Sequence, residues 1–186
     1  VDISVATWKE LKPALKQLKK APGVVFDGRG YPTDAGFEIL AHLLEEPDDD
    51  DWMFVPRHTR PDQMQPEWQP NGWHLRPKKP HLDNVAWIIG PGAISYSESV
   101  AGFVEGYALG PLVGRPTAGA NGNVNPFTVP GGFRISWTGM RVLRHDGGVQ
   151  HVRGVVPTHP VEPTAEGLKA GQDEEMEAAL ELVRNR

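Results

Sequence analysis

The chain contains two segments in which a short apolar run is followed by a glycine-rich turn and then by a helix-forming stretch. In the first segment, Val24 to Phe26 are apolar, the turn spans Asp27 to Pro32, and apolar residues recur after Asp34, a suitable N-cap. The second segment extends from Val85 to Leu109, with its turn at Gly90-Pro91-Gly92. Strands connected by a helix usually pair in parallel, because the helix carries the chain back along the sheet. Two such units predict an α/β domain with a partly parallel sheet.

The rest of the chain adds elements to this domain. A capping box at Thr7 and Glu10, followed by apolar residues at helical spacing, predicts a helix that Gly23 ends. Residues from about Arg57 to His81 show no clear periodicity and are expected to form a long loop. A last helix is expected from Asp173 onwards. Apolar and alternating runs predict short strands at residues 112–114, 127–129, 133–137 and 140–143.

Composition narrows the classes of protein. The 186 residues fit one domain, residues 1–186, and the net charge of −5 gives no basic surface for nucleic acid. No apolar run approaches the roughly 20 residues that span a bilayer. Cysteine is absent and the seven histidines lack ligand spacing, so we expect neither disulfides nor a metal site. Because the chain begins at Val1 rather than at methionine, we expect a piece of a longer protein that lacks its N-terminal part.

The turn between the second predicted strand and its helix carries three serines, Ser95, Ser97 and Ser99. A serine at such a turn can expose its hydroxyl next to converging backbone N–H groups, as a nucleophile with half of an oxyanion hole requires. Serine is also a favoured N-cap residue, so each of the three can instead serve only to cap the helix. The turn by itself favours the cap.

Four short motifs follow one another across most of the chain. They are Val24 to Pro32, Ile94 to Glu98, Val113 to Gly119 and Gly154 to Thr158. Each is weak alone, but in this order they resemble the motifs of the C-terminal processing and tricorn-like serine peptidases, family S41. The resemblance implies a ClpP/crotonase-like α/β core of ββα units with a partly parallel sheet.

The resemblance also implies roles for particular residues. Ser95 would be the nucleophile, because the family serine lies three residues before the glutamate of the motif, here Glu98. The N–H of Tyr96 would be one oxyanion donor. The second would come from the turn between Gly30 and Thr33, which lacks the usual pair of glycines. Glu98 is expected to support the turn through hydrogen bonds rather than to take protons.

The general base is the point at which the chain departs from the family. Members with a Ser–Lys dyad carry the lysine at the position of Ala120, so such a dyad is not supported here. Tricorn-like members use a histidine from an earlier segment, which would precede Val1. His151 stands close to where the family has a glutamate and is a substitute candidate, although a lone histidine on a strand is more often structural.

The resemblance therefore implies a serine-type peptide hydrolase that acts on peptides or unfolded protein without a cofactor. The isolated chain is expected to have little or no activity if its base lies upstream. Family members suggest a periplasmic or extracellular location, and the chain could also form a homo-oligomer. The alternative is a non-catalytic ligand- or peptide-binding module, as in the interphotoreceptor retinoid-binding proteins. A structural domain without a site is the third reading.

Overall fold

Four parallel strands form the central sheet of the computed structural model, which describes residues 1–62 and 64–185. Their order is β1 (Val24–Asp27), β4 (Val85–Ile89), β5 (Leu112–Gly114) and β9 (His159–Pro160). Every residue of β4 is buried, as expected for a strand covered on both faces. The predicted α/β class with a parallel sheet is confirmed.

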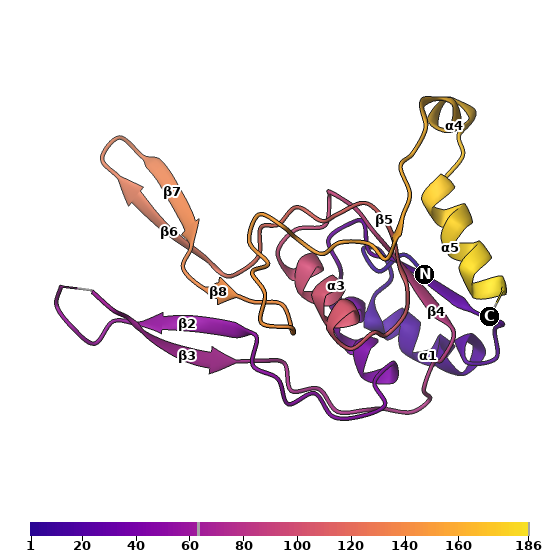
Figure 1. Ribbon diagram of the computed structural model, residues 1–186, viewed down its shortest axis with the longest axis horizontal. Helices are drawn as coiled ribbons and strands as arrows, with labels where there is room; N and C mark the ends of the chain where they lie inside the picture. Colours follow the sequence, from indigo (N-terminus) through magenta and orange to yellow (C-terminus); the bar gives the residue numbers. More distant parts are fainter. Residues whose placement is uncertain (63, 186) are drawn as a thin grey trace.

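Helices cover both faces of this sheet (Figure 1). They are α1 (Trp8–Leu18), α2 (Asp34–Glu38), the 3₁₀ helix η1 (Leu40–His42), α3 (Tyr96–Gly106) and α5 (Glu174–Arg184), while the short helix α4 (Ala165–Ala170) lies away from the sheet. Side chains alternate between the faces along each strand. Phe26 and Trp87 therefore pack with α1, η1 and α3, whereas Ile88 packs with Ala179 and Val183 of α5 on the other side.

The remaining strands project from this body as two hairpins (Figure 1). Strands β2 (Met53–Arg57) and β3 (Glu67–Asn71) pair antiparallel, and β8 (Arg141–Val142) adds a third strand beside β2. Strands β6 (Val124–Val129) and β7 (Phe133–Thr138) form the second hairpin. The prediction of a continuous loop from residue 57 to residue 81 is therefore wrong for β3. All five residues of β3 are exposed, so that strand carries no apolar alternation.

The helix ends show one correction and one confirmation. Asp34 does not cap α2, because Thr33 occupies the N-cap and accepts a hydrogen bond from the Ala35 N–H at 3.1 Å. The Asp34 carboxylate instead accepts from the Trp8 N–H at 2.8 Å, at the start of α1. The last helix begins at Asp173 as predicted, and Asp173 caps α5 by accepting a hydrogen bond from the N–H of Met176. Within residues 1–62 and 64–185, no helix has the length and hydropathy that crossing a bilayer requires.

Candidate active site

Ser95 lies where the chain leaves β4 and enters α3, and its backbone is strained. Its φ of 57° and ψ of −117° lie in a region that residues other than glycine rarely occupy. Although Ser95 is at the N-cap position, its side chain makes no capping hydrogen bond. Ser95 is half-buried, and its side chain does not cap α3. A serine in a strained turn between strand and helix is the arrangement in which hydrolases present a nucleophile.

The other two serines of the turn are used in packing. The Ser97 hydroxyl lies 3.2 Å from the Gly28 carbonyl oxygen and 3.0 Å from that of Gly30, so it connects α3 to the turn after β1. Ser99 is buried against Asn121, whose amide donates to the Ser99 oxygen at 3.1 Å. Neither hydroxyl is free to act on a substrate.

Glu98 is completely buried and holds the loop that follows β5. One carboxylate oxygen accepts hydrogen bonds from the Thr117 hydroxyl at 2.6 Å and from the Gly119 N–H at 2.7 Å. The other accepts from the Ala120 N–H at 2.7 Å. A buried carboxylate is tolerated only where such donors replace its water. These contacts agree with a supporting role for Glu98.

Sequence reasoning missed Thr117. Its hydroxyl donates to Glu98 and accepts from the Val155 N–H at 2.8 Å, so it joins three of the four motif segments. The signal that could have found it is the threonine of the motif from Val113 to Gly119.

The same loop brings Ala120 next to Ser95. The Ala120 carbonyl accepts a hydrogen bond from the Ser95 N–H at 2.9 Å. This is the position at which Ser–Lys members of the resembled family carry their base. A methyl group cannot take a proton, so the position is beside Ser95 but cannot act as its base.

The candidate oxyanion donors divide into two that are free and one that is not. The N–H of Tyr96 opens α3, where backbone donors lack helical partners, and no described residue accepts from it. The Gly30 N–H likewise has no acceptor among residues 1–62 and 64–185. The Thr33 N–H, however, donates to the Ile3 carbonyl at 2.8 Å. Of the two named residues of the Gly30 to Thr33 turn from which the second donor was expected, Thr33 is therefore excluded as the donor, and Gly30 remains the candidate.

The Tyr96 side chain packs over the turn after β1. Its hydroxyl lies 3.4 Å from the Thr33 carbonyl oxygen, and its ring is tilted against that of Tyr31 at 5.9 Å. Burial raises the pKa of Tyr96 to about 12. The phenol therefore stays protonated at neutral pH and is not a base for Ser95.

His151 is exposed, and the structure does not pair it with Ser95. It lies in a turn rather than on the expected strand, and no hydrogen bond joins the two among the described residues. The neighbouring Val152 N–H does donate to the Gly119 carbonyl at 2.7 Å, so this turn touches the loop that Glu98 holds. His151 lines a groove of about 360 Å³ together with Trp68. Among the described residues, no side chain that could act as a base is hydrogen-bonded to Ser95.

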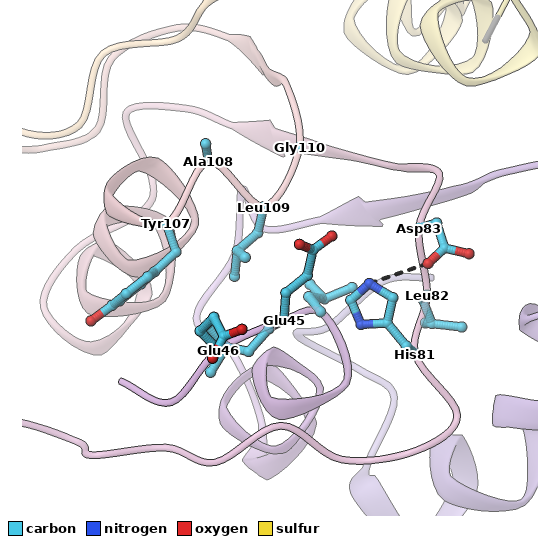
Figure 2. Close-up of a pocket in the computed structure, with 11 residues that line it drawn as sticks. Glu45, Glu46, His81, Leu82, Asp83, Tyr107, Ala108, Leu109 and Gly110 are labelled. Carbon is cyan, nitrogen blue, oxygen red and sulfur yellow. Dashed lines mark ion pairs between the residues drawn. The ribbon is translucent and has the colours of Figure 1, made fainter. Parts of the chain in front are cut away.

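A cavity of about 390 Å³ lies at the opposite end of α3 (Figure 2). Its walls include Glu45, Glu46 and Tyr107, and His81 interacts with Asp83 across 3.2 Å. Since α3 is about 16 Å long, this cavity is separate from Ser95. The described part of the chain contains no cluster of three or more acidic, histidine or cysteine side chains suited to a metal ion.

Comparison with known proteins places this arrangement among peptidases. The model of peptidase family S41 matches residues 2–161. A candidate peptidase from Parabacteroides merdae is similar in structure, with a TM-score of 0.78 and 19% identity over 98% of this chain. Mature CPAF in complex with lactacystin is similar with a TM-score of 0.76 and 14% identity over 95% of this chain. The photosystem II D1 C-terminal processing protease is similar with a TM-score of 0.59 and 18% identity over 98% of this chain.

The chain spans 58%, 46% and 45% of the length of these three proteins, respectively. At these identities the likeness establishes the fold. No curated protein matches the chain.

Proposed function

This chain belongs to peptidase family S41, and we propose that it is the catalytic core of a serine peptidase in which Ser95 is the nucleophile. The observation that carries the proposal is the strained backbone of Ser95. The Ser95 hydroxyl makes no capping hydrogen bond, and the N–H of the next residue, Tyr96, has no acceptor among the described residues. A protein pays for such strain only where the surrounding structure enforces it, and strained residues cluster at active sites.

The reaction follows from this geometry. The Ser95 oxygen attacks the carbonyl carbon of a peptide bond, and the negative charge that develops on the carbonyl oxygen is held by the N–H groups of Tyr96 and Gly30. The amine leaves with a proton, and water then hydrolyses the ester on Ser95. The proton of Ser95 must first pass to a base. Since Ala120 cannot take it and no hydrogen bond joins His151 to Ser95 among the described residues, we assign the base to a segment before Val1.

The substrate class follows from the family. Peptides or unfolded protein segments are the proposed substrates, and a periplasmic or extracellular location is part of the proposal. The alternative is a ligand-binding module on the same fold, which the absence of a lysine at Ala120 favours. The strain at Ser95 favours the peptidase, because binding alone does not require a serine in that conformation.

Covalent labelling of the full-length protein tests the proposal. A fluorophosphonate reagent is expected to modify the wild-type protein at Ser95, since the reagent requires an activated serine. Ser95→Ala should abolish labelling, whereas Ser136→Ala, at an exposed serine on β7, should leave it unchanged. Labelling at another residue, or no labelling while a hydrophobic ligand binds, would reject the peptidase in favour of the binding module.

Peptide hydrolysis by residues 1–186 alone tests whether the general base lies before Val1. Residues 1–186 alone should hydrolyse a fluorogenic peptide at less than about one thousandth of the full-length rate, because loss of a general base costs on the order of 10²–10⁴-fold. Hydrolysis by this chain alone that Ser95→Ala abolishes would place the base within it, and His151→Ala would then be the next variant.

A further inference from the structure

Arg29, in the turn after β1, uses every donor of its guanidinium. Nε and Nη2 donate to the two oxygens of Asp27 at 3.0 and 2.6 Å. Nη1 and Nη2 donate to the two oxygens of Asp173 at 2.9 and 2.7 Å. The last N–H, on Nη1, donates to Glu175 at 2.9 Å. Paired contacts of this kind fix the orientation of an arginine as well as its position.

Glu175 connects this arginine to a second one. Its other carboxylate oxygen accepts from Nε of Arg115 at 3.0 Å. Only 2% of the Glu175 side chain is exposed, whereas the two arginines keep 29% and 34% of theirs exposed. The buried charge is thus compensated on both oxygens, and removal of either arginine would leave it partly unpaired.

The two arginines belong to two loops that contact the turn around Ser95. Arg29 precedes Gly30, and a Cβ on Gly92 of the serine turn would lie 3.0 Å from the Arg29 carbonyl oxygen. Arg115 begins the loop that ends at Ala120, whose carbonyl accepts from the Ser95 N–H. One carboxylate from α5 therefore joins the segment with the second oxyanion donor to the segment that holds the nucleophile.

We propose that Glu175 is a positioning residue for the reaction at Ser95, acting through Arg29 and Arg115. The proposal rests on the proposed function of Ser95. It extends beyond the family pattern, because α5 follows residue 161, where the match to the family model ends. Ser95 and the Tyr96 N–H come from the turn before α3, whereas the Gly30 N–H comes from the turn after β1. A misplacement of about 1 Å between such groups can cost on the order of 10²-fold in rate.

The test compares two variants of the same helix in the full-length protein. Glu175→Gln keeps the shape but places an amide against two guanidinium groups. Val183→Ala removes packing of α5 on the sheet without touching the ion pairs. Both should lower Tm by a few degrees. Glu175→Gln alone should reduce the maximal rate of fluorophosphonate labelling and kcat by about tenfold or more, with KM changed much less.

Controls separate positioning from general stability. Glu177→Gln changes an exposed glutamate in the first turn of α5 and should alter neither Tm nor the reaction rate. If Val183→Ala lowers the rate as much as Glu175→Gln at the same loss of Tm, the positioning role is wrong. If Glu175→Gln does not fold, Arg115→Gln removes only the ion pair between Arg115 and Glu175 and should still lower kcat.

A failure of the proposed function can be told apart from a failure of this inference. If the wild-type protein is not labelled, Ser95 is not the nucleophile. Amide hydrogen exchange then decides the rest. Faster amide exchange at residues 90–96 and 115–120 in Glu175→Gln, but not in Val183→Ala, would still support the inference that Glu175 positions these two loops. Equal exchange in both variants would overturn it.

Discussion

Glu98 and Ser95 lie three residues apart in the chain, and their surroundings give them opposite roles. The Glu98 carboxylate is fully buried and accepts three hydrogen bonds, so its oxygens are occupied by protein donors. The Ser95 hydroxyl caps nothing, and its backbone is held in a strained conformation. A satisfied buried charge stabilises a loop, whereas an unengaged hydroxyl in a strained turn is available for chemistry.

This contrast predicts the effect of replacing Glu98. In Glu98→Gln the amide nitrogen cannot accept a hydrogen bond, so one of the N–H groups of Gly119 and Ala120 loses its partner. An unsatisfied buried group costs about 1–3 kcal/mol in the free energy of unfolding. Urea denaturation measures the cost, and Glu181→Gln, at an exposed position on α5, should stay within about 0.5 kcal/mol of wild type. Equal values for the two variants would contradict the supporting role of Glu98.

Among the elements, the three-stranded sheet of β2, β3 and β8 departs furthest from what its sequence pattern indicates. Its strands are largely exposed, and Arg141 lies 5.0 Å from the centre of the Phe54 ring and 4.8 Å from that of Trp68. Contacts of a cation with aromatic rings stabilise such a surface by about 0.5–1 kcal/mol. They join residues from three strands, so no window of neighbouring residues reveals them.

The segment after β8 carries His145, which packs against the core. Its ring lies 5.0 Å from that of Tyr107 and 5.7 Å from that of Phe103. Burial lowers the pKa of His145, although the nearby carboxylates of Asp50, Asp48 and Asp146 act in the opposite direction. The folded state therefore prefers the neutral ring.

A pH dependence follows with a definite sign. Below about pH 6.5, the ordinary pKa of histidine, the unfolded chain binds a proton at His145 that the folded chain resists, so stability is lost as the pH falls. His145→Gln should show a smaller loss of unfolding free energy between pH 7.5 and pH 5 than wild type. Val149→Ala, an exposed change in the same segment, should keep the wild-type slope. An unchanged slope in His145→Gln would show that another group causes the acid sensitivity.

At the scale of the whole molecule, the central sheet concentrates the stability. Ile88 of β4 is fully buried against α5, whereas Ile135 of the β6–β7 hairpin is 45% exposed. Ile88→Ala should therefore cost about 2–5 kcal/mol in unfolding free energy, since it removes core packing and leaves a cavity. Ile135→Ala should cost less than about 1 kcal/mol. Chemical denaturation of the two variants compares the same substitution at the two sites, and similar costs would mean that the hairpin contributes as much as the sheet.

Much of this architecture is encoded locally. The alternation of Val24, Val25 and Phe26 between the two faces, and the same pattern in β4, follow from backbone pleating and can be read directly from the sequence. The capping of α5 by Asp173 and the hairpin turn at Pro130-Gly131-Gly132 likewise depend on residues close together in the chain. The family motifs added the selection of Ser95 among three serines.

Other features depend on the path of the whole chain. The engagement of the Thr33 N–H by Ile3 corrects a proposed oxyanion donor, and it arises because the N-terminal segment passes beside that turn. The contact between Arg29 and Glu175 joins residues 146 positions apart. The sequence by itself determined the α/β class and the family and selected Ser95 as the proposed nucleophile, because these rest on local backbone preferences and short motifs. Only the tertiary structure decided which N–H groups are free and which carboxylates bind the loops, because hydrogen-bond partners are set by where distant segments meet.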